Sequence, residues 1–169
     1  MDIGALLADS LERVRDQVAD VVDGLNSDQL AWRPDDDANS IAWLLWHLTR
    51  IEDDHVAEVA GTEQVWTAAG WYDRFGLPFP PEVHGWGQTS ADVARVRVDG
   101  DLLAGYHAEV AARVVAYVGQ LTPDDLERIV DERWDPPVSL GVRLVSVVNE
   151  VNQHVGQAAY VRGMIERRR

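Results

Sequence analysis

The sequence predicts an all-α protein, a four-helix bundle with one long crossover. Apolar residues recur at helical spacing in four separate stretches, and convincing strands are hard to find. A hydrophobic fraction of 46% in 169 residues is sufficient for one core. We therefore expect a single domain over residues 1–169.

The first predicted helix covers about residues 2–24, where leucine and valine repeat every three or four positions and Gly24 is a natural stop. A further turn of helix is expected in "NSDQLAWRP". Asn26 or Ser27 would cap this turn, and Pro34 would end it.

The second predicted helix runs over about residues 40–60. Asn39 or Ser40 can cap its start, and Gly61 terminates it because glycine readily adopts the left-handed conformation. The third helix is predicted over about residues 100–120 from one stripe of leucine, valine and tyrosine.

The fourth predicted helix, over about residues 139–166, ends in "ERRR", where cations suit the negative end of the helix dipole. It is preceded by a short, stiff connector, "ERWDPPV". Between the second and third helices lies the segment "WTAAGWYDRFGLPFPPEVHGWGQTSADVARVRV", rich in Trp, Gly and Pro. At about 35 residues it exceeds a simple connection in a compact bundle, so we expect a functional cover or a long crossover.

Composition excludes several classes of partner. The 29 acidic residues outweigh the 15 basic ones, giving a formal charge of −14, which repels nucleic acid and anionic membranes alike. Without cysteine, the chain has neither disulfides nor thiolate ligands. It shows no signal peptide, no apolar run of about 20 residues, no G-x-S-x-G elbow and no Gly-rich phosphate loop. We expect a cytoplasmic protein.

Seven tryptophans are many for this length, and several fall in loops or at the ends of predicted helices. They either fill the core and anchor loops or, if grouped around polar residues, form the wall of a pocket. The tryptophans are Trp32, Trp43, Trp46, Trp66, Trp71, Trp86 and Trp134.

The last helix places a carboxylate and an imidazole one turn apart in "SVVNEVNQHVGQ". Glu150 and His154, at i and i+4, share a helix face. His154 lies within the apolar stripe and Glu150 at its edge. Because a buried carboxylate is costly unless it is paired or bound to a cation, two interpretations remain: a Glu–His hydrogen bond or a metal site.

The second helix adds His47, which is one turn from both Leu44 and Ile51 and therefore points towards the bundle. Alone it would be a hydrogen-bonded core histidine. Two imidazoles and a carboxylate are the ligands of a catalytic zinc, or a comparable divalent metal, with one position left open. Facing helices of a bundle often carry such sites. We therefore predict a metal site formed by His47, Glu150 and His154.

The remaining histidines and one acidic run have weaker interpretations. His55 is a fourth ligand, a hydrogen-bond donor to a ligand, or structural, and His107 packs near the stripe of the third helix. His84, in the crossover, contacts substrate or is simply exposed. The run "EDDH" is a solvated helix face or, alternatively, a carboxylate pair for acid–base chemistry.

These residues resemble the DinB-like superfamily, which includes the YfiT-type proteins and the mycothiol- or bacillithiol-dependent transferases. The resemblance rests on "WLLWHL", "HVGQAAYVRG" and the loop-rich crossover. Where many members carry histidine, this chain has Glu150, and this is similar to the mycothiol-dependent maleylpyruvate isomerase branch, whose metal is held by His, Glu and His. The resemblance implies His47, Glu150 and His154 as ligands, zinc or else nickel as the metal, a homodimer, and no DNA binding.

The resemblance further implies an enzyme that uses a low-molecular-weight thiol such as mycothiol for S-transfer to, or isomerisation of, a small electrophile. Arg50, Arg74 and Arg162 are candidates to bind an anionic substrate, or are ordinary surface and salt-bridge residues. One alternative is a metal-dependent hydrolase with Asp54 and His55 as candidate bases. Another is a non-enzymatic, stress-associated metal-binding protein.

Overall fold

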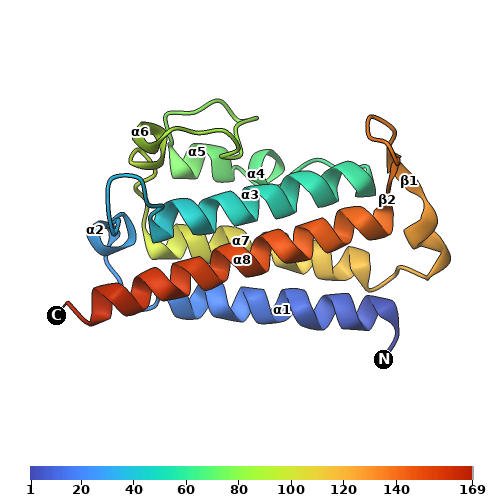
Figure 1. Ribbon diagram of the computed structural model, residues 1–169, viewed down its shortest axis with the longest axis horizontal. Helices are drawn as coiled ribbons and strands as arrows, with labels where there is room; N and C mark the ends of the chain where they lie inside the picture. Colours follow the sequence, from blue (N-terminus) through green and yellow to red (C-terminus); the bar gives the residue numbers. More distant parts are fainter. Residues whose placement is uncertain (169) are drawn as a thin grey trace.

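The computed structural model describes residues 1–168, which are mostly helical, as predicted. Within this range, four long helices pack side by side (Figure 1). Both α1 and α3 contact α7 and α8, so α1 and α3 lie opposite each other and the apolar faces of all four meet in one core. The four helices are α1 (Ile3–Val22), α3 (Ile41–Ala60), α7 (Gly100–Val118) and α8 (Leu140–Glu166).

The direction of the helices explains the long crossover. Figure 1 shows α1 and α8 running one way, and α3 and α7 running the other. Because α3 and α7 are parallel, the chain must return the full length of α3, about 30 Å for a helix of this size, before α7 can begin. The crossover is more structured than a loop: Trp66 and Trp71 pack into the core, and the segment forms three short helices. These are α4 (Val65–Ala68), α5 (Trp71–Phe75) and α6 (Ser90–Val93).

Several predicted helix ends are confirmed by their capping contacts. Asn26 begins α2 (Ser27–Leu30) with a reciprocal capping box. The Ser40 hydroxyl accepts a hydrogen bond from the amide of Trp43 at 3.1 Å and so caps α3. Gly61 ends α3 with a φ of 68°.

A small hairpin precedes α8 and was not expected from the sequence. A 3₁₀ turn, η1 (Asp124–Glu127), leads into β1 (Ile129–Asp131), which pairs antiparallel with β2 (Val138–Ser139). Strands of three and two residues are too short to show an alternating pattern. The connector before α8 is therefore a hairpin rather than simply a stiff link.

Arg50 holds the crossover against α3. It is 0% exposed, and its guanidinium donates to the side-chain oxygen of Gln64 at 2.7 Å and to the carbonyl of Pro81 at 3.0 Å. It also lies 5.0 Å from the ring centroid of Trp66. The buried guanidinium thus satisfies carbonyl groups of the crossover that would otherwise lack partners.

The prediction that "EDDH" is a solvated face is wrong for its first two residues. Glu52 and Asp53 are 1% and 4% exposed, because the crossover and α7 cover this side of α3. Asp53 accepts hydrogen bonds from the amides of Val65 and Trp66 at 2.9 and 2.8 Å and from the hydroxyl of Tyr106 at 2.8 Å. Its carboxylate therefore ties the start of α4 and helix α7 to α3.

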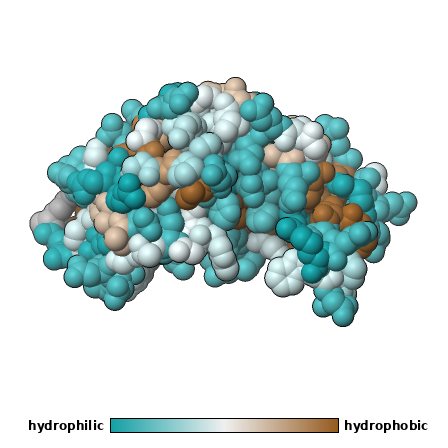
Figure 2. Space-filling model, turned by 90° about the horizontal axis from the view of Figure 1, so that it is seen from above, coloured by the Kyte–Doolittle hydropathy of each residue, from teal (hydrophilic) through white to brown (hydrophobic). Residues whose placement is uncertain are grey.

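Most of the surface in view is polar. Figure 2 shows one face as largely hydrophilic, with apolar side chains gathered in separate patches. No helix in residues 1–168 combines the length and apolar character needed to cross a membrane.

Candidate metal centre

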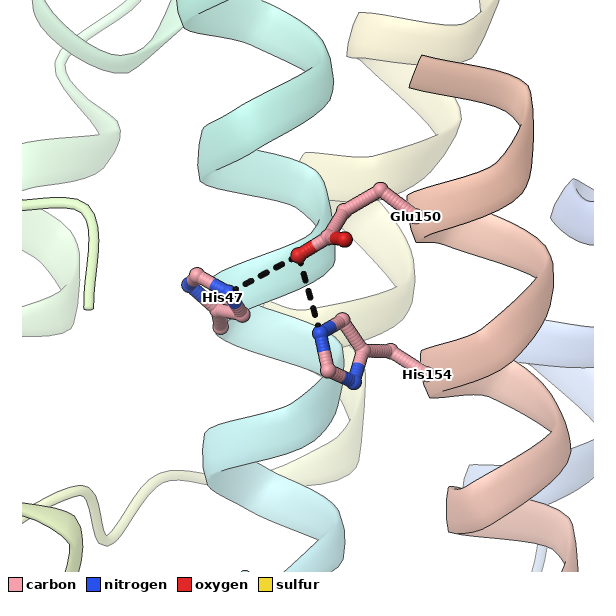
Figure 3. Close-up of side chains that lie close together, drawn as sticks. All are labelled: His47, Glu150 and His154. Atoms are coloured by element: carbon pink, nitrogen blue, oxygen red, sulfur yellow. Dashed lines mark hydrogen bonds and ion pairs between the residues drawn. The ribbon is translucent and has the colours of Figure 1, made fainter. Parts of the chain in front are cut away.

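Two helices bring the three predicted ligands together. His47 projects from α3, and Glu150 and His154 project from α8 into the space between the helices (Figure 3). Glu150 Oε1 lies 3.3 Å from His47 Nε2 and 3.0 Å from His154 Nε2. One donor atom from each residue lies within 4.8 Å of the others. In residues 1–168 this is the one group of three or more His, Cys, Asp or Glu side chains with such spacing.

The crossover fixes the orientation of His47. The carbonyl of His84 lies 2.5 Å from His47 Nδ1. A carbonyl can only accept, so Nδ1 carries the proton and Nε2 keeps its lone pair. Gly85 permits this approach: its φ is +102°, and a Cβ there would lie only 2.5 Å from Nδ1. Trp43 stacks on the other side of the ring, with centroids 4.6 Å apart.

His154 is oriented in the same way by its own helix. Its Nδ1 lies 2.8 Å from the side-chain oxygen of Gln157, three residues further along α8. With Nδ1 donating to the Gln157 oxygen, Nε2 is the nitrogen that faces Glu150, at 3.0 Å. A protonated Nε2 donates to the Glu150 carboxylate, which is the Glu–His hydrogen bond expected as one interpretation, and a deprotonated Nε2 offers its lone pair to a metal. Both imidazoles thus present the same nitrogen to the same carboxylate oxygen.

This donor set fits a divalent cation. The pKa of His47 is lowered mainly by burial, so its ring is neutral near pH 7. When both Nε2 atoms are deprotonated, two imidazole lone pairs and a carboxylate oxygen face one another, and a divalent cation can take the place of the protons that otherwise bridge them. With bonds of about 2.0–2.1 Å, neighbouring ligands of tetrahedral zinc lie about 3.4 Å apart. The two Glu150 distances are close to that value.

The centre is closed on the α3 side and open on the α8 side. The side chain of His47 is 4% exposed, whereas those of His154 and Glu150 are 16% and 32% exposed. Three protein ligands and one accessible side are typical of catalytic metal sites, in which a fourth position receives substrate or water.

A family described as mycothiol-S-transferase matches residues 6–167 of this chain. The chain belongs to the mycothiol-S-transferase family. This confirms the DinB-like resemblance. A crystal structure titled as the conserved protein of a locus from Enterococcus faecalis superposes with a TM-score of 0.89 at 29% identity, over 96% of each chain. None of the curated proteins matches the chain.

The two candidate bases of a hydrolytic reaction lie apart from the cluster of His47, Glu150 and His154. His55 is two turns beyond His47 on α3, about 12 Å along the helix. Its Nδ1 lies 3.2 Å from the guanidinium of Arg143. Asp54 accepts a hydrogen bond from Gln64 at 2.7 Å. Neither His55 nor Asp54 joins the three-residue cluster.

The three candidate arginines all bind parts of the protein itself. Arg50 is buried beneath the crossover. Arg74 lies over the ring of Trp71, 3.5 Å from its centroid. Arg162 donates to the carbonyls of Asp20, Val21 and Asp23 at 2.7–2.9 Å and so caps the end of α1.

The other histidines and the tryptophans divide between core and surface. His107 is buried on α7, with Nδ1 3.4 Å from Glu52, and the side chain of His84 is half-buried. Most tryptophans fill the core, and within residues 1–168 Trp43 is the one in ring contact with the histidines of the centre. Trp43, Trp46, Trp66 and Trp71 are buried, Trp32 is half-buried, and Trp86 and Trp134 are exposed.

Three contributors to the centre were not predicted from the sequence: the carbonyl of His84, Gly85 and the amide of Gln157. The carbonyl has no side-chain signature. The only local signals were the glycines of "HGWG" in the crossover and the glutamine of "HVGQ" three residues after a predicted ligand.

Proposed function

We propose that this chain is a metal-dependent S-transferase that joins the sulfur of mycothiol, or a closely similar thiol, to an electrophilic carbon of a small molecule. The thiol loses its proton, and the bond from that carbon to a leaving group such as halide, or to the oxygen of an epoxide, breaks. The observation that supports the proposal most strongly is that two imidazole Nε2 atoms from different helices lie 3.3 and 3.0 Å from the same carboxylate oxygen, with all three donor atoms within 4.8 Å of one another. Membership of the mycothiol-S-transferase family supplies the thiol.

In this proposal His47, Glu150 and His154 hold the cation. A divalent cation at this position would lower the pKa of a coordinated thiol, so that the thiolate is available near neutral pH. The chain itself provides no sulfur nucleophile because it has no cysteine. The His84 carbonyl and the Gln157 amide keep both imidazoles in the tautomer that can bind metal.

Zinc is the metal we propose, with nickel as the alternative, since two imidazoles and one carboxylate suit both. The four long helices then serve as a four-helix-bundle scaffold that carries the ligands on facing helices. We propose a cytoplasmic homodimer with a small-molecule substrate. The hydrolase alternative receives less support because Asp54 and His55 have other partners.

Metal analysis tests the ligand assignment. Protein purified without a metal-affinity tag should contain close to one divalent ion per chain. His154→Ala should abolish binding, and Glu150→Ala should weaken it strongly. Glu166→Ala is a matched control, because Glu166 is a carboxylate on the same helix that pairs with Arg162. Normal metal content in both ligand variants would show that other residues bind the ion.

Activity tests the reaction. Zinc-loaded protein with mycothiol and a panel of aryl halides and epoxides should consume thiol and electrophile in equal amounts. His154→Ala should lose this activity while keeping its helical content. Hydrolysis of the electrophiles without loss of thiol would favour the hydrolase instead, and metal binding without any turnover would favour a non-enzymatic role.

A further inference from the structure

A pocket of about 510 Å³ lies beside the candidate metal centre and shares one of its residues. It is formed between the segment 34–39, which precedes α3, and the end of α8. Gln157 lines this pocket and also accepts the hydrogen bond from His154 Nδ1. The pocket residues on α8, 156–161, are centred about 10 Å along the helix from Glu150 and His154. A ligand of moderate size can therefore reach both places.

The pocket wall is held in place without a ligand. The carboxylate of Asp35 accepts hydrogen bonds from the amides of Asp37 and Ala38 at 3.0 and 2.8 Å. Arg33 donates to the carbonyls of Asp36 and Ala38 in the same loop. A pre-formed wall lowers the entropic cost of binding, as is usual for small-molecule sites.

The lining indicates the chemistry of the ligand. Amide and carboxylate groups come from Asn39, Gln157 and Asp37, and Tyr160 offers an aromatic ring that is 68% exposed. Among residues 1–168, no Lys, Arg or His lines the pocket, so an anionic ligand would lack a partner and would be repelled by Asp37. Hydroxyl groups suit these donors and acceptors, and the ring suits the apolar face of a sugar.

Gly156 is the second observation that points to a ligand. It lies in the interior of α8, where glycine is less favourable than alanine. Its φ is not positive, and a Cβ added there would meet no atom of the described chain within 4 Å. Packing therefore does not require glycine at this position. It does, however, lie in the pocket and leaves the helix backbone open to close approach by a bound molecule.

We infer that this pocket binds the uncharged, hydroxyl-rich body of the thiol cosubstrate while the sulfur of that cosubstrate lies at the metal centre. The inference rests on the proposed function. Mycothiol matches it in chemistry, because its thiol is carried on hydroxyl-rich rings. Gly156 provides the space for those rings, Tyr160 packs against them, and Gln157 links their position to that of His154.

The test compares Gly156→Ala with Gly163→Ala in the zinc-loaded protein. Gly163 is also within α8, outside the pocket, and a Cβ there would meet only the flexible end of Arg167. Both variants should raise the melting temperature by about 2 °C, since alanine favours the helix. Only Gly156→Ala should weaken mycothiol binding, by about 10-fold or more in calorimetry. Tyr160→Ala should weaken it as well.

N-acetylcysteine, a thiol without the hydroxyl-rich body, separates the two sites. Its affinity and the zinc content should be the same in wild type and Gly156→Ala. Equal mycothiol affinity in wild type and Gly156→Ala would overturn the inference, as would equal losses for both thiols. Wild type that binds mycothiol no tighter than N-acetylcysteine would also overturn it but leave the proposed function intact. Wild type that binds neither thiol would overturn both.

Discussion

Gly85→Ala should weaken metal binding although Gly85 is not a ligand. The added Cβ would lie 2.5 Å from His47 Nδ1, 3.1 Å from its Cγ and 3.2 Å from the ring of Trp43. His47 is held between Trp43 and the crossover and cannot move aside freely. The crossover must therefore move away from α3, and the hydrogen bond from His47 Nδ1 to the carbonyl of His84 is then lost.

The substitution has two separate effects, one on folding stability and one on metal affinity. Placing alanine at a φ of +102° costs about 1–3 kcal/mol of folding stability in the metal-free protein. Loss of the carbonyl that orients a metal-binding histidine typically lowers metal affinity by about 10- to 100-fold. That change corresponds to about 1.4–2.7 kcal/mol of binding free energy.

Competition with a chromogenic chelator measures the affinity, and urea unfolding of the metal-free protein measures the stability. Gly87→Ala is the matched control: Gly87 has a φ of +75°, lies in the same loop, and a Cβ there would meet nothing of the described chain within 4 Å. It should lose stability yet keep its metal affinity. Equal metal affinity in the two variants would refute the orienting role of the His84 carbonyl.

Three further predictions concern residues outside the ligand set. Burial raises the pKa of Glu52 to about 8 and lowers the pKa of His107 to about 4. A carboxyl whose pKa is higher in the folded state makes the protein less stable as the pH rises, until the pH passes the folded-state pKa. Glu52 should therefore lower the unfolding free energy of wild type by up to about 1.4 kcal/mol per pH unit between about pH 6.5 and 7.5, with a smaller slope near pH 8, and Glu52→Gln should lack this loss in urea unfolding. An unchanged slope in Glu52→Gln would contradict this. Gln157→Leu should lower metal affinity about 10-fold, whereas Gln157→Glu, which keeps an acceptor for His154, should restore it; equal losses in both variants would speak against the orienting contact. Arg162→Ala should lower the unfolding free energy by about 1–2 kcal/mol and leave the KM for thiol unchanged; a raised KM would return Arg162 to the candidate substrate ligands.

Local patterns predicted much of the scaffold. The caps at Asn26 and Ser40 and the stop at Gly61 are decided by residues within one turn, so the sequence contains the whole signal. The pair Glu150 and His154 shares a face because of helix geometry alone.

Contacts across long stretches of chain were beyond such patterns. The sequence predicted a solvated helix face for Glu52 and Asp53, because no residue near them in the chain shows that the crossover and α7 cover them. Arg50 and Arg162 were predicted as candidate substrate ligands, because the backbone carbonyls that they bind lie far away in the chain and could not be identified from the sequence. The contact between the His84 carbonyl and His47 could not be predicted for the same reason.

The division of the three donors between helices has a thermodynamic consequence. Glu150 and His154 are fixed relative to each other by one helical turn, whereas His47 reaches them only when α3 has docked on α8. An unfolded chain cannot offer this triad at fixed spacing, so a bound ion would stabilise the docking of α3 on α8. Its affinity would then report how well the tertiary structure is formed, and chelation would loosen the whole protein rather than one pocket.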